Sequence, residues 1–486
     1  MLFCLMLAAT PVVSFKDADK IRSWDAWHDH ESKAAITHVL QKEKPCIPWK
    51  NLQEMKFGLP EIGRLRTRTS SEVKGSKWSI NCAGEDRDYA DWDAYKDLVP
   101  MLGVKRMRFL SGWAKTEQVK GVYDFAWLDH ILRECNARSV KPWVCLCYGN
   151  PVYGSDFRLG MRVSQLIGDK EAFAAWLRYV KATVARYRDI VDEWEIWNEP
   201  FRQGEEYATL YMATARAVRE VQPTAKVLCT SIIYPKDYTA VLERLKAENA
   251  YDLCDGFIYH PYSPNPDESY TIGEGQFCEQ PPIKLLKLVK SYSPKYGIIQ
   301  GECGCPSQLE YAHAMHDIEW TEYSQAKWDL RRAIGDAVRD IPSNMFSMID
   351  LKYTYMLQSF GLVRSNLLKE FVYRRPSWYA MRNLFGLIDD DVKPISVETR
   401  GRLTTATFTR SGKPIYFVWF SDKQPGSELK MERIKLSLAI ANPVWVEMIT
   451  GRACSLGSLD SVPVWDSPVL IAETGAVPLV VSENGK

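Results

Sequence analysis

The stretch VDEWEIWNEPF, residues 191–201, contains the repeating unit from which the fold can be inferred. Its first part, 191–197, mixes Val, Ile and Trp with acidic residues over a short run, which predicts a strand. Before it, residues 170–188 place large apolar side chains three and four positions apart, as an amphipathic helix does. A second helix is predicted over 204–221, ending before a proline. The order helix, strand, helix indicates a βα repeat.

The same alternation continues from about residue 76 onward. Short β-branched or apolar runs predict eight strands, over residues 77–82, 104–110, 141–148, 191–197, 225–232, 254–260, 295–301 and 344–351. Eight strands with intervening helices favour a (β/α)8 TIM barrel over an open doubly wound sheet. We therefore predict an α/β barrel over residues 76–390.

The pattern changes after residue 390. Short strands separated by Gly, Pro, Asn and Asp are predicted over 403–410, 414–420, 433–440, 443–450, 467–473 and 476–481. They indicate a small antiparallel β-sandwich over residues 391–486. The charged segment 16–75 is open to two interpretations: it caps the barrel, or it lends a strand to the β domain.

Composition limits the classes of partner. The chain has 486 residues, 46% hydrophobic and 25% charged, enough for one large domain and an accessory one. Lys and Arg number 62 against 61 Asp and Glu, which gives a formal net charge of +1. Because no overall field would recruit nucleic acid, a neutral or locally recognised ligand is expected.

The N-terminal residues 1–15 form an apolar run from Leu2 to Phe15, interrupted by Thr10 and Pro11. The run is too short to span a bilayer, which takes about 20 apolar residues. It resembles the apolar core of a secretory signal, although the basic residues that normally precede such a core are missing. A buried N-terminal strand is the alternative. We expect a secreted or periplasmic protein without membrane insertion.

The cysteines and histidines predict neither a disulfide framework nor a metal site. Twelve cysteines are spread without regular spacing. Two pairs of thiols share a strand face, Cys145 with Cys147 and Cys303 with Cys305. This spacing differs from the zinc-binding CxxC, so buried free thiols are expected. Two histidine pairs, His28 with His30 and His313 with His316, lack an identifiable carboxylate set. No cofactor or metal is expected.

Two carboxylates are predicted to meet at the mouth of the barrel. The working residues of a TIM barrel stand at the C-terminal ends of its strands. The fourth predicted strand leads into Glu199 and the seventh into Glu302, and these strands face each other. Retaining cleavage of a glycosidic bond needs two carboxyl groups about 5 to 5.5 Å apart, one as nucleophile and one as acid and then base. The predicted positions of Glu199 and Glu302 make such a separation reachable.

Strand alternation adds two expectations about the fourth strand. It puts Glu195 on the same face as Glu199 but deeper in the barrel, where a carboxylate needs a paired partner. It would also point Asn198 and Glu199 apart, so a bend or bulge is required there, next to Pro200.

The residues WEIWNEP (194–200) and IIQGECG (298–304) resemble the acid/base and nucleophile motifs of clan A glycoside hydrolases, a group of retaining (β/α)8 enzymes. The resemblance implies that Glu199 is the acid/base and Glu302 the nucleophile. It also implies that Asn198 holds the sugar hydroxyl next to the anomeric carbon.

Further matches extend the resemblance. The second strand ends in Arg108. Members of the clan have an arginine there that contacts the nucleophile, so the resemblance implies this role for Arg108. The alternative is that Arg108 forms an ordinary ion pair inside the barrel. The sixth ends in His260-Pro-Tyr262, similar to the clan's His-x-Tyr, whose tyrosine donates to the nucleophile. The pattern is most similar to glycoside hydrolase family 39 and its neighbours, which include β-xylosidases, α-L-iduronidases and polysaccharide endo-hydrolases. Strand eight, FSMIDLKY (346–353), lacks the tryptophan that many members present to the sugar.

Aromatic and amide side chains cluster at the ends of strands two to four: Trp113, Tyr148, Asn150, Tyr153, Trp197 and Phe201. Aromatic faces pack against sugar rings, but such residues are equally common in cores. We predict that Trp113, Tyr148 and Asn150 bind substrate, together with Arg108, Asn198, His260 and Tyr262.

The stretch Asp86-Arg87-Asp88 either binds a distal sugar or caps a helix starting near Tyr89. The alternative to an enzyme is a non-catalytic glycan-binding protein on the same barrel. Either interpretation implies an oligo- or polysaccharide partner.

Overall fold

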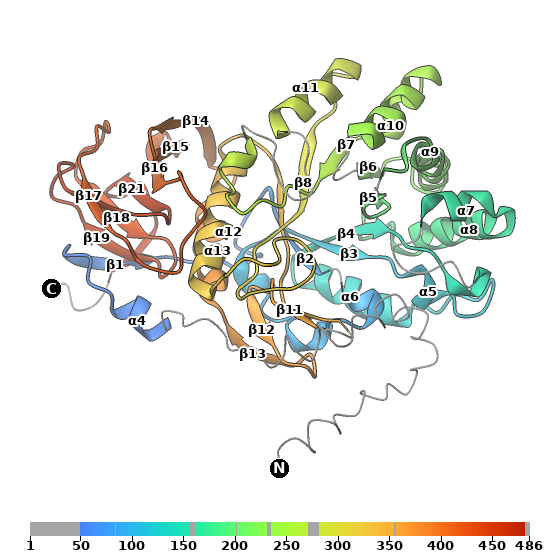
Figure 1. The fold of residues 1–486 in the computed structure, drawn as a ribbon, viewed down its shortest axis with the longest axis horizontal. Coiled ribbons are helices and arrows are strands. Elements are labelled where there is room, and N and C mark those ends of the chain that lie inside the picture. The colour runs from blue at the N-terminus through green and yellow to red at the C-terminus, as the bar shows by residue number, and fades with distance from the viewer. Residues whose placement is uncertain are drawn as a thin grey trace, which may run out of the picture.

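The computed structural model describes residues 49–82, 84–154, 162–200, 202–230, 235–270, 281–353 and 356–481. Figure 1 shows a barrel wrapped by helices and, at the other end of the molecule, an antiparallel sheet. The expected signal at residues 1–15 lies outside the described residues. Among the described helices, none is both long and apolar enough to cross a membrane.

Eight parallel strands close into a barrel, in the order in which they occur in the chain. They are β2 (Trp78–Cys82), β3 (Arg106–Leu110), β4 (Lys141–Leu146), β5 (Glu193–Ile196), β6 (Lys226–Thr230), β7 (Gly256–Tyr259), β8 (Ile298–Cys303) and β9 (Ser343–Met345). The barrel closes where β9 pairs with β2. Each strand overlaps one of the eight predicted runs, so the TIM-barrel prediction is confirmed, although β9 begins one residue before its run and ends well short of residue 351.

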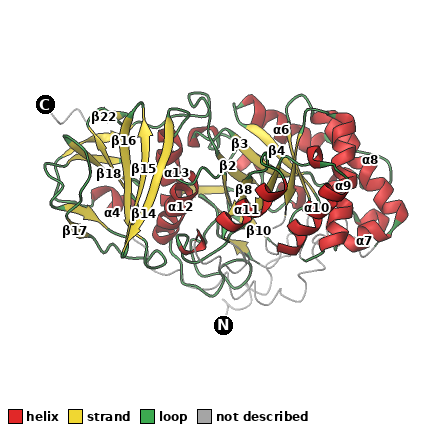
Figure 2. Cartoon of the chain, turned by 90° about the horizontal axis from the view of Figure 1, so that it is seen from above, coloured by secondary structure: helices red, strands yellow, loops and turns green. Residues whose placement is uncertain are grey.

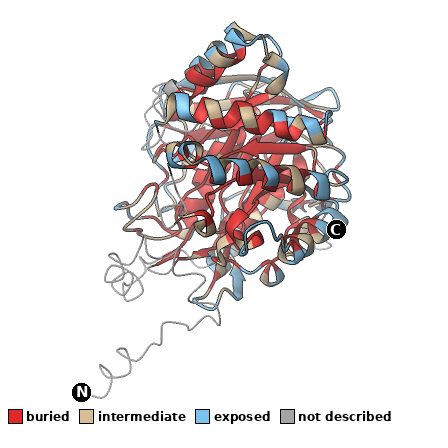
Figure 3. Ribbon diagram, turned by 90° about the vertical axis from the view of Figure 1, so that its right-hand side faces the viewer, coloured by how far each residue is buried: buried red, intermediate tan, exposed pale blue. Residues whose placement is uncertain are grey.

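Helices surround these strands: α5 (Trp113–Thr116), α6 (Ala126–Ala137), α7 (Val163–Gly168), α8 (Lys170–Tyr187), α9 (Gly204–Val221), α10 (Pro235–Ala247), α11 (Pro282–Tyr292), α12 (Glu322–Ala337) and α13 (Pro376–Leu387). Helices α8 and α9 match the two predicted around the opening stretch. The side chain of Asp169 caps α8 by accepting from the backbone N–H of Ala172, 3.0 Å away. Figure 3 shows buried strands enclosed by helices whose outward faces are exposed.

The first repeat departs from this pattern. After β2 the described chain forms short 3-10 helices, the first over Glu85–Arg87, and no α-helix begins near Tyr89. The alternative that Asp86 caps such a helix is therefore wrong.

The C-terminal region is an eight-stranded antiparallel sheet in the order β14-β15-β16-β21-β18-β19-β1-β22. Its strands are β14 (Val392–Arg400), β15 (Leu403–Arg410), β16 (Lys413–Phe420), β21 (Val469–Glu473), β18 (Pro443–Glu447), β19 (Arg452–Ser455), β1 (Glu61–Leu65) and β22 (Leu479–Val481). Strand β1 comes from the N-terminal segment and pairs with both β19 and β22. Of the two interpretations of residues 16–75, the structure therefore supports a lent strand for residues 61–65.

The sheet has two different faces. Phe408 and Phe417 share a core with the barrel, whereas Val418 and Trp445 belong to a second core. The second core is closed by a sheet of only two strands, β17 (Glu432–Ile434) and β20 (Val462–Val464). The prediction of antiparallel strands is confirmed. The region has one large sheet and one sheet of two strands, however, and not the two comparable layers of a β-sandwich.

The sheet and the barrel are held together through α12 and α13, which lie between them in Figures 1 and 2. The buried ammonium of Lys327 on α12 donates to the carbonyls of Gly426 and Glu428 and contacts Asp466 at 2.7 Å. Two short β hairpins follow β9, formed by β10 (Leu351–Lys352) with β11 (Leu357–Gln358) and β12 (Val363–Ser365) with β13 (Phe371–Arg374).

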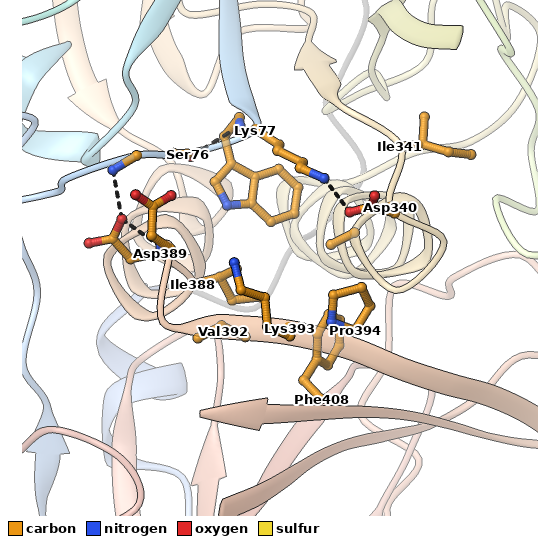
Figure 4. Close-up of a pocket in the computed structure, with 14 residues that line it drawn as sticks. Ser76, Lys77, Asp340, Ile341, Ile388, Asp389, Val392, Lys393, Pro394 and Phe408 are labelled. Carbon is orange, nitrogen blue, oxygen red and sulfur yellow. Dashed lines mark hydrogen bonds and ion pairs between the residues drawn. The ribbon is translucent and has the colours of Figure 1, made fainter. Parts of the chain in front are cut away.

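A cavity of about 90 Å³ lies on the same side of the barrel as the sheet. Figure 4 shows it between Lys77, which precedes β2, Ile341, which precedes β9, and Lys393 and Phe408 of the sheet. Because Lys77 and Ile341 precede their strands, this cavity sits at the N-terminal end of the barrel, away from the strand ends considered next.

Candidate active site

The predicted polar residues around the two carboxylates come from four barrel strands. Arg108 is on β3, Glu195 is on β5, Glu302 is on β8, and the others follow β5 and β7 directly. One oxygen of Glu199, one of Glu302 and a ring nitrogen of His260 all lie within 4.8 Å of one another. Barrel closure has thus brought the two predicted carboxylates together.

A backbone turn aims the end of β5 at the mouth. The strand ends at Ile196, and both Trp197 (φ 67°) and Glu199 (φ 52°) have left-handed backbone conformations. Non-glycine residues rarely adopt such angles. Because the pleat is broken here, Asn198 and Glu199 need not point apart. The bend required by the sequence is present.

Glu302 is held by three donors. Arg108 donates from Nη1 to Oε2 at 2.9 Å, Tyr262 donates its hydroxyl to Oε1 at 3.0 Å, and Asn81 donates from Nδ2 to Oε2 at 3.4 Å. Two of these donors reach Oε2 and one reaches Oε1, so both oxygens of the carboxyl group are held in place. Sequence reasoning missed Asn81, although its place near the end of the first strand was a usable signal.

Glu199 has a different environment. Burial raises its pKa to about 7, while the positive charge of Arg108 opposes the rise. His260 is buried, and burial lowers the pKa of its ring to about 4. The ring is therefore neutral near pH 7, and its Nδ1, 3.0 Å from Oε1 of Glu199, can donate a hydrogen bond. One carboxyl group is buried with a raised pKa, while the other accepts hydrogen bonds from three side chains.

Asn198 is fixed beside the pair. It accepts from Nη2 of Arg108 at 2.8 Å and donates from Nδ2 to the hydroxyl of Tyr148 at 2.7 Å. The guanidinium of Arg87 lies 5.4 Å from the ring centre of Tyr148 and contacts Asp86 at 3.2 Å. Tyr148 and Arg87 are therefore next to the site.

Trp113 and Asn150 belong to a separate buried group. The indole of Trp113 donates to Glu117 at 2.6 Å, and Asn150 donates to the backbone carbonyl of Glu117 at 2.8 Å. Tyr153 stacks on Trp113 and also donates to Glu117. The described contacts do not bring these residues to the two carboxylates. Phe201 lies outside the described residues.

At strand eight, Phe346 stands directly after β9, where the family resemblance leads one to expect a tryptophan. Its ring packs against Phe360 at 5.6 Å, and Phe360 packs against Tyr262 at 6.2 Å. An aromatic side chain is thus present at this position, in contact with the group around Tyr262.

The cysteines and the remaining histidines are accounted for within the described part of the chain. Its nine cysteines are all buried. His313 packs on Tyr353 and His316 contacts Asp317, while His28 and His30 lie outside the described residues. Apart from the carboxylate pair with His260, one cluster among the described residues has metal-ligand geometry: Asp93, His130 and Glu134. There the ammonium of Lys96 already contacts Asp93 at 2.6 Å and Glu134 at 3.0 Å.

These features define a (β/α)8 barrel with an asymmetric carboxylate pair at its C-terminal mouth. No protein-family model matches the chain, and no curated protein matches its sequence. The chain is similar in structure to a family 39 glycoside hydrolase from the gut symbiont Bacteroides cellulosilyticus, with 17% identity, a TM-score of 0.64, and 82% of this chain and 80% of that chain covered. It is also similar to the catalytic domain of the family 30 xylanase C from Talaromyces cellulolyticus, with 11% identity, a TM-score of 0.53, and 85% and 98% covered. At these identities the likeness establishes the fold.

Proposed function

We propose that this protein is a retaining glycoside hydrolase that cleaves O-glycosidic bonds of an oligo- or polysaccharide. The observation that carries the proposal is the approach of Glu199 and Glu302 to within 4.8 Å in unequal environments. Close carboxyl groups are typical of the retaining mechanism, since an inverting enzyme leaves room for a water between them at about 6.5 to 9.5 Å.

In the first step an oxygen of Glu302 forms a bond to the anomeric carbon and the glycosidic C–O bond breaks. The leaving oxygen takes the proton of Glu199, which becomes a carboxylate. In the second step Glu199 takes a proton from water, the water oxygen bonds to the anomeric carbon, and the ester bond to Glu302 breaks. The raised pKa of Glu199 suits both roles near neutral pH.

Arg108, Tyr262 and Asn81 orient the carboxyl group of Glu302 for its attack on the anomeric carbon. Asn198 is oriented from both sides, by Arg108 and by Tyr148, and its role is to bind the hydroxyl next to the anomeric carbon. The sequence motifs that resemble family 39 support a β-xylosidase-like or related activity, and the fold is similar to that of a family 39 glycoside hydrolase. No step requires a metal or an organic cofactor.

The test is a panel of aryl glycosides and polysaccharides, with product anomers followed by NMR from the first turnover, and trapping by activated 2-fluoro sugars. A covalent adduct on Glu302 and a first product of retained configuration are expected. Tight glycan binding without adduct or turnover would instead indicate a non-catalytic glycan-binding protein. An inverted first product would contradict the roles given to both carboxylates.

We also propose export from the cytoplasm, supported by the apolar run from Leu2 to Phe15. N-terminal sequencing of protein recovered from the periplasm or the medium of its native host should find this run removed. Recovery only from the cytoplasm, with the run intact, would contradict export.

A further inference from the structure

A buried ion pair lies next to the two catalytic carboxylates. Glu195 accepts from Arg108 through both oxygens, from Nε to Oε2 at 2.7 Å and from Nη2 to Oε1 at 2.8 Å. Neither side chain is exposed to solvent. Two parallel hydrogen bonds of this kind fix the plane of the guanidinium.

The same guanidinium also reaches the site. Besides Glu195 it donates to Glu302 at 2.9 Å and to Asn198 at 2.8 Å. Of these three acceptors, Asn198 is neutral and Glu302 loses its charge when its oxygen becomes an ester. Only Glu195 can stay anionic through both steps.

We propose that Glu195 is a positioning residue that anchors Arg108 and supplies its permanent counter-charge, an inference that rests on the proposed glycosidase function. Without this anchor, Arg108 would be drawn onto Glu302, which would stabilise the resting carboxylate and weaken it as a nucleophile. Once the ester formed, Arg108 would be a buried cation without an anionic partner among these acceptors. Leaving such a charge uncompensated is strongly destabilising.

The other titratable groups around Arg108 do not replace Glu195. Burial raises the pKa of the Cys145 thiol on β4 and lowers that of His260, so both are neutral near pH 7. Glu199 feels Arg108 and Glu195 with opposite effects on its pKa, and Arg87 lowers it further. Removing the negative charge of Glu195 should therefore make Glu199 a stronger acid.

The chain supplies a matched control on the same strand. Glu193, two positions earlier on β5, pairs with Arg106 of β3 at 2.6 and 2.8 Å. This is also an Arg–Glu ion pair between the same two strands, but the other hydrogen bond to Glu193 comes from Lys226, and none of these described partners belongs to the active site. Glu193→Gln removes the same chemical group as Glu195→Gln without touching the guanidinium that serves Glu302.

The experiment compares kcat/KM from pH 4 to pH 10 for the parent, Glu195→Gln and Glu193→Gln, on an aryl glycoside that the parent cleaves. Glu195→Gln should lower kcat/KM by about 10- to 100-fold, as small misplacements of reacting groups do. It should also move the basic limb of the profile down by about 0.5 to 1 pH unit. Glu193→Gln should leave both limbs in place. A Glu195→Gln profile that matches the parent, or an equal shift in Glu193→Gln, would overturn the proposal.

A second variant covers the case in which Glu195→Gln does not fold. Glu195→Asp keeps the charge but shortens the side chain, so kcat/KM should fall by about 10-fold while the basic limb stays in place. Parent-like kcat/KM in Glu195→Asp would overturn the anchoring role. If the parent turns over no glycoside, both the proposed function and the role of Glu195 are wrong. If the parent is active and the variants are unaffected, only the role of Glu195 is wrong.

Discussion

The acid/base role that we propose for Glu199 predicts where the activity of this protein falls with pH. Burial raises the pKa of Glu199 from 4.5 to about 7. The residue must be protonated to donate to the leaving oxygen, so the active form of the free enzyme lies below this pKa. The basic limb of kcat/KM should therefore have its midpoint near pH 7.

The expected size of the effect follows from the fraction of Glu199 that is protonated. That fraction is about nine tenths at pH 6, about one tenth at pH 8 and about one hundredth at pH 9. We expect kcat/KM to be nearly constant up to pH 6 on this limb, to halve at the midpoint near pH 7, and to fall about tenfold for each pH unit above pH 8.

The assay measures kcat/KM for aryl glycosides with good and poor leaving groups, in the parent and in Glu199→Gln. The variant should lose about 10²- to 10⁴-fold on poor leaving groups, less on a dinitrophenyl glycoside, and should lack the basic limb. A limb that remains in Glu199→Gln would assign it to another group. A parent profile that already breaks near pH 4.5 would refute the argument from burial.

The same pKa predicts a change in stability. The folded pKa of about 7 lies above the unfolded value of 4.5, so this group's contribution to stability is lost as pH rises from 4.5 to 7. The side chain of Glu199 is 23% exposed, and solvent screening reduces the cost to about 1 to 2 kcal/mol. Chemical denaturation should find Glu199→Gln more stable than the parent by this amount at pH 8 and equal to it at pH 4. Equal stability at both pH values would contradict the raised pKa.

Three further results are expected. Tyr262→Phe removes a hydrogen bond to Glu302, so kcat/KM should fall about 10- to 100-fold with an unchanged fold; an unaffected kcat/KM would exclude a contribution of this contact. Gly304→Ala would bring its Cβ to 1.6 Å from the carbonyl oxygen of Phe346 and should lower Tm markedly, whereas Gly297→Ala, with nothing within 4 Å, should not; equal Tm values would contradict this close approach. Prolonged dialysis against a chelator should leave turnover unchanged, and a loss restored by one metal would show that the chemistry needs an ion.

The barrel could be predicted from the sequence because its signals are local. Each strand is a short run of β-branched or aromatic residues, and each helix repeats its apolar side chains every three to four positions. Eight such pairs leave few topologies. The carboxylates could be proposed for the same reason, since Glu199 and Glu302 each follow or end a predicted strand.

Other elements carry weaker local signals. β1 over Glu61–Leu65 is a short run with an arginine and a glycine, and it becomes a strand because β19 and β22 pair with it on either side. β14 over Val392–Arg400 contains a proline and several charged residues, as an edge strand can, and was not predicted. The run 433–440 was predicted as one strand but forms one only up to Ile434.

The sequence by itself determined the order of strands and helices, the barrel, and which polar residues stand at strand ends, because each depends on neighbours along the chain. Tertiary structure alone decided the chemistry of those residues. Arg108, Glu195 and Glu302 come from three different strands, and only closure of the barrel lets one guanidinium bind both carboxylates. The pKa of Glu199 likewise reflects burial by groups from several strands, so no local pattern contains it.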